Sequence, residues 1–562
     1  MGKDMVERNI KLDIKTVDPT ISEALAVIKN YPYIKGLKTC WYDPNDQSLN
    51  FQFLFETGLP SRLRETKEGV KAEEEVIFSF SSEYPALGPT IKLRPDFNRS
   101  LAHVQPGEKG SNVIPCLVDG EQNEFFHAEG LWSLLNQVKS WFDKAVANNL
   151  IDPKQGWEPI RRDSVKDTIV LDGRQAKAEA EKRSYSPFEI RALRFTKYFL
   201  QNQGVESFYF RSLMSSEPLT ISDRNVNNLF KSDRYDDFAH GYSLGIFIRP
   251  GKDASGKRAV ADTYQPDTVQ SYEDLLEFAS AVGCGENFTN ALNILKKKLT
   301  RSSSDGFSFP VVFVFCVQRP FHLIGQASSI ELIPYVVESA FPDLFTDQSK
   351  IQVYAASHRE SIKPVMLKQI SGFPDTQEPL NTTLIGCGSL GSKIAIHLAR
   401  SGIAPNRLID KNALSPHNAA RHALLPMGGD GIQAIWLQSK ANAVEYGISG
   451  LGQKTEAYYE DVCKAVADNN MLNQFFPNKN QIVINATAAL SVRDALGSIA
   501  YKSDKARTLE ASLFGNATLG FLSIEGKKRN PSTTDMIAEF YELSRSEPSL
   551  KNALSMKDMA RP

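Results

Sequence analysis

The chain has 562 residues, of which 41% are hydrophobic and 10% aromatic, which is more than a single core usually supports, so two to four domains are expected. Lysine plus arginine (65) balance aspartate plus glutamate (66), and a formal net charge of −1 gives no global field that favours nucleic acid or an anionic membrane. No apolar run reaches the ~18 residues of a membrane helix, and the amino-terminal residues lack an apolar signal core. We therefore expect a cytoplasmic protein whose ligand is a protein or a small molecule.

The cysteines of the chain are scattered, without any Cys-x-x-Cys pair. They stand at positions 40, 116, 284, 316, 387 and 463. This spacing disfavours both a zinc site and a disulfide framework. The role of each thiol therefore depends on its local setting.

The first block, residues 1–150, has the pattern of an α+β domain. Alternating apolar residues predict strands at Leu49–Glu56 and Val76–Phe80, and a turn that ends at Pro85 leads to another strand. The simplest interpretation is an antiparallel meander.

An irregular segment, Pro95–Asp119, follows these strands and contains Cys116. After it, apolar residues recur with the spacing of an amphipathic helix from Leu131 to Ala145. Loops on a rigid scaffold commonly carry functional groups, so Cys116 is a candidate for chemistry. The alternative is a small buried apolar residue, the more common role of a lone cysteine.

A further set of residues surrounds this cysteine: Phe78-Ser79-Phe80, Tyr84-Pro85, Pro89, His103, Pro106, Pro115-Cys116-Leu117 and the helix Trp132–Ala145. The set resembles the ubiquitin-conjugating fold, specifically the bacterial conjugating domains that are fused to an activating domain. The resemblance implies that Cys116 is the thioester cysteine, a role that suits a thiolate because it takes up an acyl group reversibly. Conjugating enzymes usually have His-Pro-Asn before the cysteine, whereas this chain has His103-Val104-Gln105-Pro106. The oxyanion stabiliser is therefore left open between His103 and a backbone N–H.

Residues 151–375 predict an α+β linker domain without recognisable chemistry. Its predicted elements are a charged solvated helix or linker at Gly173–Ser184, strands at Tyr242–Arg249 and Phe309–Cys316, a turn at Lys252–Lys257 and an amphipathic helix at Tyr272–Val282. Cys284 and Cys316 are interpreted as packing residues. The bacterial fusions also have a linker domain at this place.

The third block, residues 376–562, begins with a nucleotide-binding pattern. A predicted strand, Thr382–Ile385, is followed by Gly386-Cys387-Gly388-Ser389-Leu390-Gly391 and a predicted helix, Ser392–Arg400. The glycines let backbone N–H groups and a helix N-terminus approach phosphates. Asp410, about 20 residues beyond the glycines, stands where Rossmann-type domains bind a ribose hydroxyl. This pattern alone would also fit a dehydrogenase.

The residues after Asp410 distinguish a dehydrogenase from another kind of nucleotide-binding enzyme. They are His417-Asn418-Ala419-Ala420-Arg421, Lys440 on a helix expected to begin near Gln433, a strand at Ile482–Ile484 and Arg493. Their order resembles the superfamily of ubiquitin-activating and sulfur-carrier adenylyltransferases, the ThiF family. The resemblance implies a Rossmann-like adenylation domain in which Asn418, Arg421, Lys440 and Arg493 bind ATP, Arg421 and Lys440 acting in catalysis. Two arginines and a lysine suit the charge that develops when a carboxylate attacks an α-phosphate, although each alone would pass for a surface group.

Two departures from this family concern magnesium and a second cysteine. The family commonly has aspartate at Asn485, and its magnesium-binding aspartate aligns near Ala488, so the Mg²⁺ ligand stays unassigned between Asp461 and Asp494. Fused activating enzymes carry a thioester cysteine downstream of the glycine loop, yet no cysteine follows Cys463. Either the sequence ends before that cysteine, which we favour, or the acyl group passes directly to Cys116.

The resemblance also implies a biological setting. The bacterial fusions belong to cyclic-oligonucleotide anti-phage (CBASS) operons, where they conjugate the C-terminus of a cGAS/DncV-like nucleotidyltransferase to a target amine. ATP with Mg²⁺ as cofactors and a homodimer are expected from the same source. Two alternatives stay open: a catalytically silent interaction protein with a degenerate nucleotide domain, and a sulfur-carrier adenylyltransferase, for which the first block has no purpose.

Overall fold

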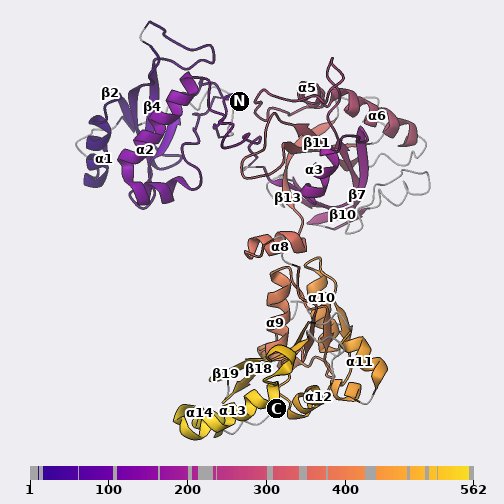
Figure 1. Ribbon diagram of the computed structural model, residues 1–562. Coiled ribbons are helices and arrows are strands. Elements are labelled where there is room, and N and C mark those ends of the chain that lie inside the picture. Colours follow the sequence, from indigo (N-terminus) through magenta and orange to yellow (C-terminus); the bar gives the residue numbers. More distant parts are fainter. Residues whose placement is uncertain are drawn as a thin grey trace. The chain divides into compact units, whose positions relative to one another are not determined.

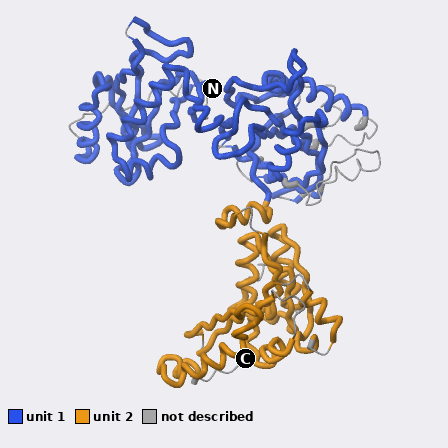
Figure 2. The backbone as a smooth tube through the Cα atoms, viewed as in Figure 1, with its two compact units in different colours: residues 1–361 blue, residues 362–562 orange. Residues whose placement is uncertain are grey.

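The structure, a computed structural model, divides the chain into two compact units, residues 1–361 and 362–562 (Figure 2). It describes residues 10–11, 17–60, 62–105, 110–162, 165–199, 206–212, 232–235, 237–299, 308–340, 351–374, 378–424, 438–466, 468–477, 481–499, 506–515 and 517–555. Pro106 and Gln433, which entered the sequence predictions, lie outside these residues. The described part contains mixed α and β structure with several separate sheets. None of its helices is long and apolar enough to cross a membrane.

The first unit begins with an antiparallel sheet in the order β1-β2-β3-β4-β5 (Figure 1). The elements around it are β1 (Ile10–Lys11), α1 (Pro19–Lys29), β2 (Ile34–Asp43), β3 (Ser48–Glu56), β4 (Glu73–Phe80), β5 (Thr90–Leu93) and α2 (Gln122–Val146). The predicted meander is therefore confirmed. The predicted helix from Leu131 is confirmed as the main part of α2, because the backbone leaves helical geometry at Gly130, where φ is 79°.

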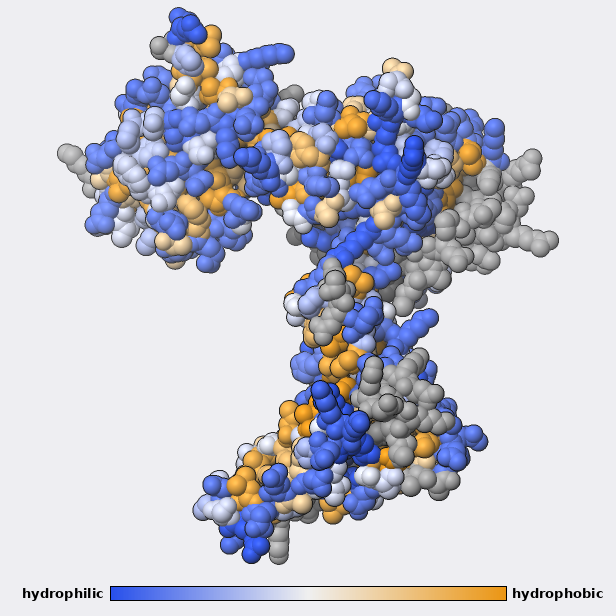
Figure 3. Space-filling model, in the orientation of Figure 1, coloured by the Kyte–Doolittle hydropathy of each residue, from blue (hydrophilic) through white to orange (hydrophobic). Residues whose placement is uncertain are grey.

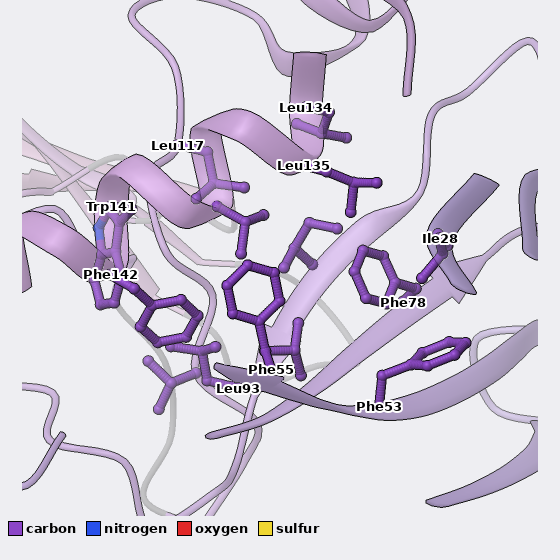
Figure 4. Close-up of a cluster of buried hydrophobic side chains, with 14 of the residues drawn as sticks. Ile28, Phe53, Phe55, Phe78, Leu93, Leu117, Leu134, Leu135, Trp141 and Phe142 are labelled. Atoms are coloured by element: carbon purple, nitrogen blue, oxygen red, sulfur yellow. The ribbon is translucent and has the colours of Figure 1, made fainter. Parts of the chain in front are cut away.

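One hydrophobic core holds the helices and this sheet together. Phe53, Phe55 and Phe78 from the strands meet Leu134 and Phe142 from α2 (Figure 4), and each of these side chains is fully buried. Alternation along the strands directs these rings to one face of the sheet. The loop between β5 and α2 is bound to this core, so its conformation is set by packing as well as by its own hydrogen bonds.

The rest of the first unit is built on a second sheet of the described residues, in the order β11-β12-β13-β6-β8-β7-β10-β9. Because β10 also pairs with β11, seven of these strands close into a barrel. The elements are β6 (Asp167–Leu171), α3 (Gly173–Glu181), β7 (Phe188–Phe199), β8 (Glu206–Ser212), β9 (Ser232–Arg234), β10 (Phe238–Ile248), α5 (Tyr272–Ala281), α6 (Gly285–Leu299), β11 (Ser308–Gln318), β12 (Ile330–Ala340) and β13 (Gln352–Glu360). The predicted strands and the amphipathic helix of the linker are confirmed.

The two faces of the barrel have separate cores. The helices α5 and α6 pack against one face, whereas α3 packs with residues from all seven closing strands. The helix predicted within Gly173–Ser184 is confirmed as α3, and several of its residues are exposed. The prediction that it is wholly solvated is wrong, because Ala176 and Ala180 are buried within this second core. These alanines are four residues apart and form a narrow apolar stripe, which the charged residues around them hide in the sequence. Cys284 and Cys316 are buried, as predicted.

The second unit contains a sheet in the order β16-β15-β14-β17-β18-β19, parallel except for the last strand. The elements are α8 (Pro364–Ile370), β14 (Thr382–Ile385), α9 (Ser389–Arg400), β15 (Arg407–Ile409), η3 (Pro416–Ala420), α10 (Lys440–Ser449), β16 (Glu456–Tyr458), η4 (Val462–Val466), α11 (Asn469–Phe475), β17 (Ile482–Asn485), α12 (Leu490–Ser498), β18 (Arg507–Phe514), β19 (Leu519–Ile524), η5 (Lys527–Arg529), α13 (Thr533–Ser546) and α14 (Pro548–Ser555). The strand order reverses between β14 and β17, which is the place where open α/β sheets bind ligands.

Helices cover the two faces of this sheet unequally. The helices α9 and α10 cover one face, and α11 and α12 cover the other. On β18 and β19, Leu513, Leu522 and Ile524 are 46%, 73% and 49% exposed. Leu522 lies opposite Ala511, and Ile524 opposite Leu509, a residue that packs on the core beneath α9 and α10. The exposed leucines and isoleucine therefore extend that face, and Figure 3 shows apolar surface in this part of the unit.

Candidate active sites

Cys116 lies in the loop between β5 and α2 and is half-buried. Its N–H donates to the carbonyl of His103 at 2.8 Å, and Val104 forms a β-bridge with Pro115. Its thiol lies 3.8 Å from the carbonyl oxygen of Val118. The next side chain, Leu117, points into the hydrophobic core (Figure 4). The cysteine is thus held on a fixed loop with part of its surface accessible.

Accessibility separates Cys116 from most of the other thiols. Cys40, Cys284, Cys316 and Cys387 are buried, and Cys463 is half-buried. Burial raises the pKa of Cys316 to about 12 and also raises the pKa values of Cys284 and Cys387, so these groups stay protonated. The accessible thiols are therefore Cys116 and Cys463. Burial, followed by the charge of Asp461, also raises the pKa of Cys463, which makes it the weaker candidate for a nucleophile.

His103, the candidate oxyanion group, is adjacent to Cys116 through main-chain contacts. Its φ is +56°, in the left-handed region, and its carbonyl accepts hydrogen bonds from Cys116 and from the Trp141 indole, the latter at 3.2 Å. Burial, together with the charges of Lys144 and Arg161, lowers the pKa of the imidazole. The ring is therefore neutral at pH 7, and a neutral ring retains one N–H donor.

The glycine loop connects β14 to α9 in the second unit. Gly386 has a φ of +89°, and a Cβ at Gly391 would lie 1.7 Å from the Gly386 carbonyl oxygen. A Cβ at Gly386 would lie 3.0 Å from the N atom of Thr487, so this loop touches the loop that follows β17. By contrast, a Cβ at Gly388 would meet nothing within 4 Å. Two of the glycines are needed for packing of the chain itself, while Gly388 borders open space.

The amino terminus of α9 offers backbone donors to an anion. Gly388 is the N-cap, and no side chain caps this end. Uncapped N–H groups and the helix dipole favour a phosphate here. Asp410, at the end of β15, accepts the N–H of Cys387 at 2.7 Å and that of Asn412 at 2.8 Å. Each carboxylate oxygen keeps capacity for a further donor, so the predicted ribose contact is compatible with this geometry.

The segment that contains Asn418 and Arg421 is docked on the same loop. The Asn418 side chain accepts the Ser415 N–H at 2.9 Å and caps the short helix η3. Arg421 is exposed at its side chain, and its carbonyl oxygen accepts Lys393 Nζ at 2.6 Å. The buried His422 lies with Nε2 3.0 Å from the Cys387 carbonyl oxygen. Lys393 and His422 were missed by the sequence analysis, because only their position beside the glycine loop gives them a role.

Lys440 is the first residue of α10, so the described helix begins there. Its N–H donates to the carbonyl of Asn412 at 3.0 Å, which brings the start of α10 beside the segment after Asp410. The positive charge of Lys440 contributes, after burial, to lowering the pKa of His422. Lys440 therefore lies close enough to the glycine loop for its charge to act there. The expected start of this helix near Gln433 is wrong, because Ser439 is the N-cap and has an extended backbone.

Arg493 is buried and paired with a carboxylate, whereas a phosphate-binding arginine needs donors that are free to contact the ligand. It lies on α12 with 6% of its surface exposed, and its Nε is 2.9 Å from Glu510 Oε2. The hydrogen bonds to Glu510, more than its burial, set the direction of its pKa, which is raised. Glu510, on β18, was missed by the sequence analysis, although a glutamate between the apolar residues Leu509 and Ala511 of a strand is a signal of a buried partner. The predicted role of Arg493 at ATP stays a prediction.

The residues considered for magnesium do not converge. The side-chain oxygen of Asn485 accepts the Thr487 hydroxyl at 2.7 Å, and Ala488 has a φ of +53°. Asp461 accepts Lys411 Nζ at 3.1 Å, and Asp494 is exposed. Among the described residues, no cluster of three His, Cys, Asp or Glu side chains could hold a metal ion. The Mg²⁺ ligand therefore stays unassigned within the described residues.

Comparison with known proteins gives one match to a protein family. The model described as Prokaryotic E2 family A matches residues 49–181, from within β3 to the end of α3. This segment is E2-like. It contains Cys116 and His103, and it extends beyond the first sheet into the barrel. No curated protein matches the chain.

Similar solved structures cover smaller parts of the chain. Crystal structures of Escherichia coli MccB with AMPCPP and MccA (13% identity, 31% of this chain and 52% of that one, TM-score 0.23), of E. coli tRNA N6-threonylcarbamoyladenosine dehydratase TcdA with AMP (17%, 27% and 54%, TM-score 0.19) and of PaaA (22%, 24% and 37%, TM-score 0.18) are among them. The chain spans between about one third and about one half of the length of these proteins.

Proposed function

We propose that this chain is an ATP-dependent conjugating enzyme that activates a protein C-terminus and carries it as a thioester on Cys116. A carboxylate oxygen of the substrate attacks the α-phosphorus of ATP, and pyrophosphate leaves. The acyl group then passes to the Cys116 thiolate, either by direct attack on the adenylate with loss of AMP or from another cysteine whose thiolate has displaced AMP first. A target amine finally displaces the Cys116 thiol. One observation carries the proposal: a half-exposed cysteine in an E2-like segment and an uncapped helix after a glycine loop occur in the same chain.

We place the proposed nucleotide site at the glycine loop of the second unit. Backbone N–H groups at the start of α9 would bind the phosphates beside Gly388, and Asp410 would hold the ribose. Arg421 and Lys440 would neutralise charge that develops on the phosphoryl oxygens and on the leaving pyrophosphate. Mg²⁺ would then be held mainly by the phosphates and water, because no described cluster of carboxylates supplies its ligands.

The proposed substrate is the C-terminus of a cGAS/DncV-like nucleotidyltransferase, within anti-phage signalling. Its support is the resemblance of the residues around Cys116 and after Asp410 to the bacterial fusions. A second copy of the chain is proposed as a partner. The exposed Leu513, Leu522 and Ile524 on β18 and β19 support it, because a contiguous apolar face on a sheet favours association.

ATP–pyrophosphate exchange, measured with and without the nucleotidyltransferase, tests the proposal. We expect exchange that depends on the intact C-terminus of that protein and stops when its last residues are removed. Calorimetry should show ATP binding with magnesium and no measurable NAD binding. Tight NAD binding together with weak ATP binding would contradict the nucleotide assignment.

A catalytically silent interaction protein is the second candidate. The pairing of Arg493 with Glu510 and the presence of Asn485 and Ala488, where the resembled family has acidic residues, favour it. In that case partner binding would persist without any exchange or thioester. The same exchange assay therefore separates the two candidates.

A further inference from the structure

The loop that carries Cys116 is bound by a carboxylate from outside its own sheet and helix. Glu158 follows the first hydrophobic core in the chain, and its Oε2 accepts the His103 N–H at 2.6 Å. The same oxygen lies 3.5 Å from His103 Nδ1, so the main-chain contact is much the closer one. The Glu158 side chain is 7% exposed. A buried carboxylate on a backbone N–H makes a charge-assisted hydrogen bond.

The residues beside Glu158 form backbone hydrogen bonds with the barrel. The Trp157 N–H donates to the His322 carbonyl at 2.7 Å, and its own carbonyl accepts the Ile324 N–H at 3.0 Å. On the other side, the Ile160 N–H donates to Glu331 at 2.6 Å. The backbone on both sides of Glu158 is therefore held by hydrogen bonds to the barrel, which fixes the position of this buried side chain.

His103 transmits this contact to the cysteine. Its N–H is held by Glu158, while its carbonyl accepts the N–H of Cys116 at 2.8 Å and the Trp141 indole at 3.2 Å. Its φ of +56° is a conformation that costs energy for a residue with a side chain. Hydrogen bonds on both sides of one residue therefore hold it in the strained conformation that fixes the position of Cys116.

We propose that Glu158 is a positioning residue for the thioester cysteine, acting through the main chain of His103. This inference rests on the proposed function and extends it to a residue of the segment that joins the two parts of the first unit. The charged groups that face the His103 ring are Glu158 itself, 3.5 Å from Nδ1, and Lys144 on α2, Arg161 and Asp119. The inference needs no change in the protonation of that ring, because Glu158 binds the backbone.

Three variants of the full chain test the role of the acceptor oxygen. Glu158→Gln keeps a side-chain oxygen at the same distance, Glu158→Ala removes it, and Glu158→Asp withdraws it by one methylene. We expect Glu158→Ala to lower the single-turnover rate of Cys116 charging at least ~10-fold, the scale expected for a lost hydrogen bond to a charged group. Glu158→Gln should stay within ~3-fold of the wild type, and ATP–pyrophosphate exchange should be unchanged in all three.

Hydrogen exchange by mass spectrometry gives a direct readout of the loop. Peptides that cover His103 and Cys116 should exchange faster in Glu158→Ala and at the wild-type rate in Glu158→Gln. If the alanine variant does not fold, Glu158→Asp replaces it, with an expected loss of at least ~3-fold in charging. Wild-type charging by both the alanine and aspartate variants, or equal loss in the glutamine and alanine variants, would overturn the inference.

The two proposals can fail separately. If the wild-type chain forms no thioester, the proposed function fails, but alkylation of Cys116 by iodoacetamide can still be followed by mass spectrometry. The positioning role then predicts an alkylation rate that differs between Glu158→Ala and the wild type and is restored in Glu158→Gln. Equal alkylation rates in all variants would remove the positioning role independently of the enzymatic reaction.

Discussion

Arg493 and Glu510 form a buried ion pair in which the guanidinium Nε lies 2.9 Å from one carboxylate oxygen and 3.0 Å from the other. The two side chains are 7% and 1% exposed. The same arginine is the one whose place in the sequence resembles a phosphate-binding residue. The Arg493 guanidinium therefore has two candidate roles, a structural one as the partner of Glu510 and a catalytic one at the phosphates of ATP. Substitutions at this pair can distinguish the two roles.

Arg493→Ala should destabilise the second unit strongly, because it leaves the Glu510 carboxylate buried without its partner. Loss of one member of a buried pair typically costs ~3–5 kcal/mol in the free energy of unfolding. Urea denaturation followed by circular dichroism measures the effect. Arg545→Ala is the matched control, since its pair with Glu542 is exposed and should change stability by less than ~1 kcal/mol.

A double substitution separates packing from catalysis at this pair. Arg493→Met combined with Glu510→Leu should recover most of the stability that Arg493→Ala loses, because it removes both buried charges. If Arg493 also contacts ATP, the double variant will be stable yet defective in pyrophosphate exchange. Full exchange activity in the stable double variant would confine Arg493 to a structural role.

Lys440→Ala and Arg421→Ala should each reduce adenylate formation at least ~10-fold without loss of folding, since one charged contact to a transition state contributes ~2–4 kcal/mol. Both residues lie beside the glycine loop, and the Arg421 side chain is exposed. Pyrophosphate exchange is the measurement. Lys454→Ala, which removes an exposed lysine beyond α10, is the control, and equal rates in all three proteins would mean that the triphosphate is misplaced.

Cys116→Ser should trap the substrate as an oxyester that resists thiol reductants, whereas the wild type forms a thiol-sensitive band on non-reducing electrophoresis. Cys116→Ala should abolish charging and preserve pyrophosphate exchange. Cys463→Ser, at the other half-buried thiol, is the control and separates direct transfer from relay through that cysteine. Conjugation that persists in Cys116→Ala would refute the role of Cys116 and leave the adenylation proposal intact.

The barrel should lose stability in acid because of His358. Burial, followed by the charge of Lys177, lowers the pKa of its imidazole from 6.5 to about 4. Between these values the unfolded chain binds a proton that the folded chain does not, so stability is full above pH 6.5 and falls as the pH drops towards 4. The total loss is about 3 kcal/mol. Urea midpoints at pH 7 and pH 4.5 should differ less in His358→Gln, and an equal difference would exclude this histidine as the cause.

The sequence predicted the elements that depend on local patterns. Period-two alternation located β3 and β4, and the glycine spacing located the turn between β14 and α9. Contacts between residues distant in the chain were not predictable. Glu158 lies 55 positions from His103, Glu510 lies 17 positions from Arg493, and the barrel closes through pairing of β10 with β11. Periodicity reports which face of an element is buried, but it does not report which partner buries it.

The hydrogen bond between the His103 N–H and Glu158 limits where domains of such proteins can be exchanged. A fragment that ends at Leu150 retains the aromatic core of the first sheet, yet it lacks the carboxylate that accepts the His103 N–H and the ring of Tyr264, which packs against that core. The first sheet and its helices therefore do not contain all the contacts that hold the Cys116 loop. Exchange of this part between related chains would preserve the loop only when the exchanged piece also includes residues 151–160 and a barrel that can anchor them.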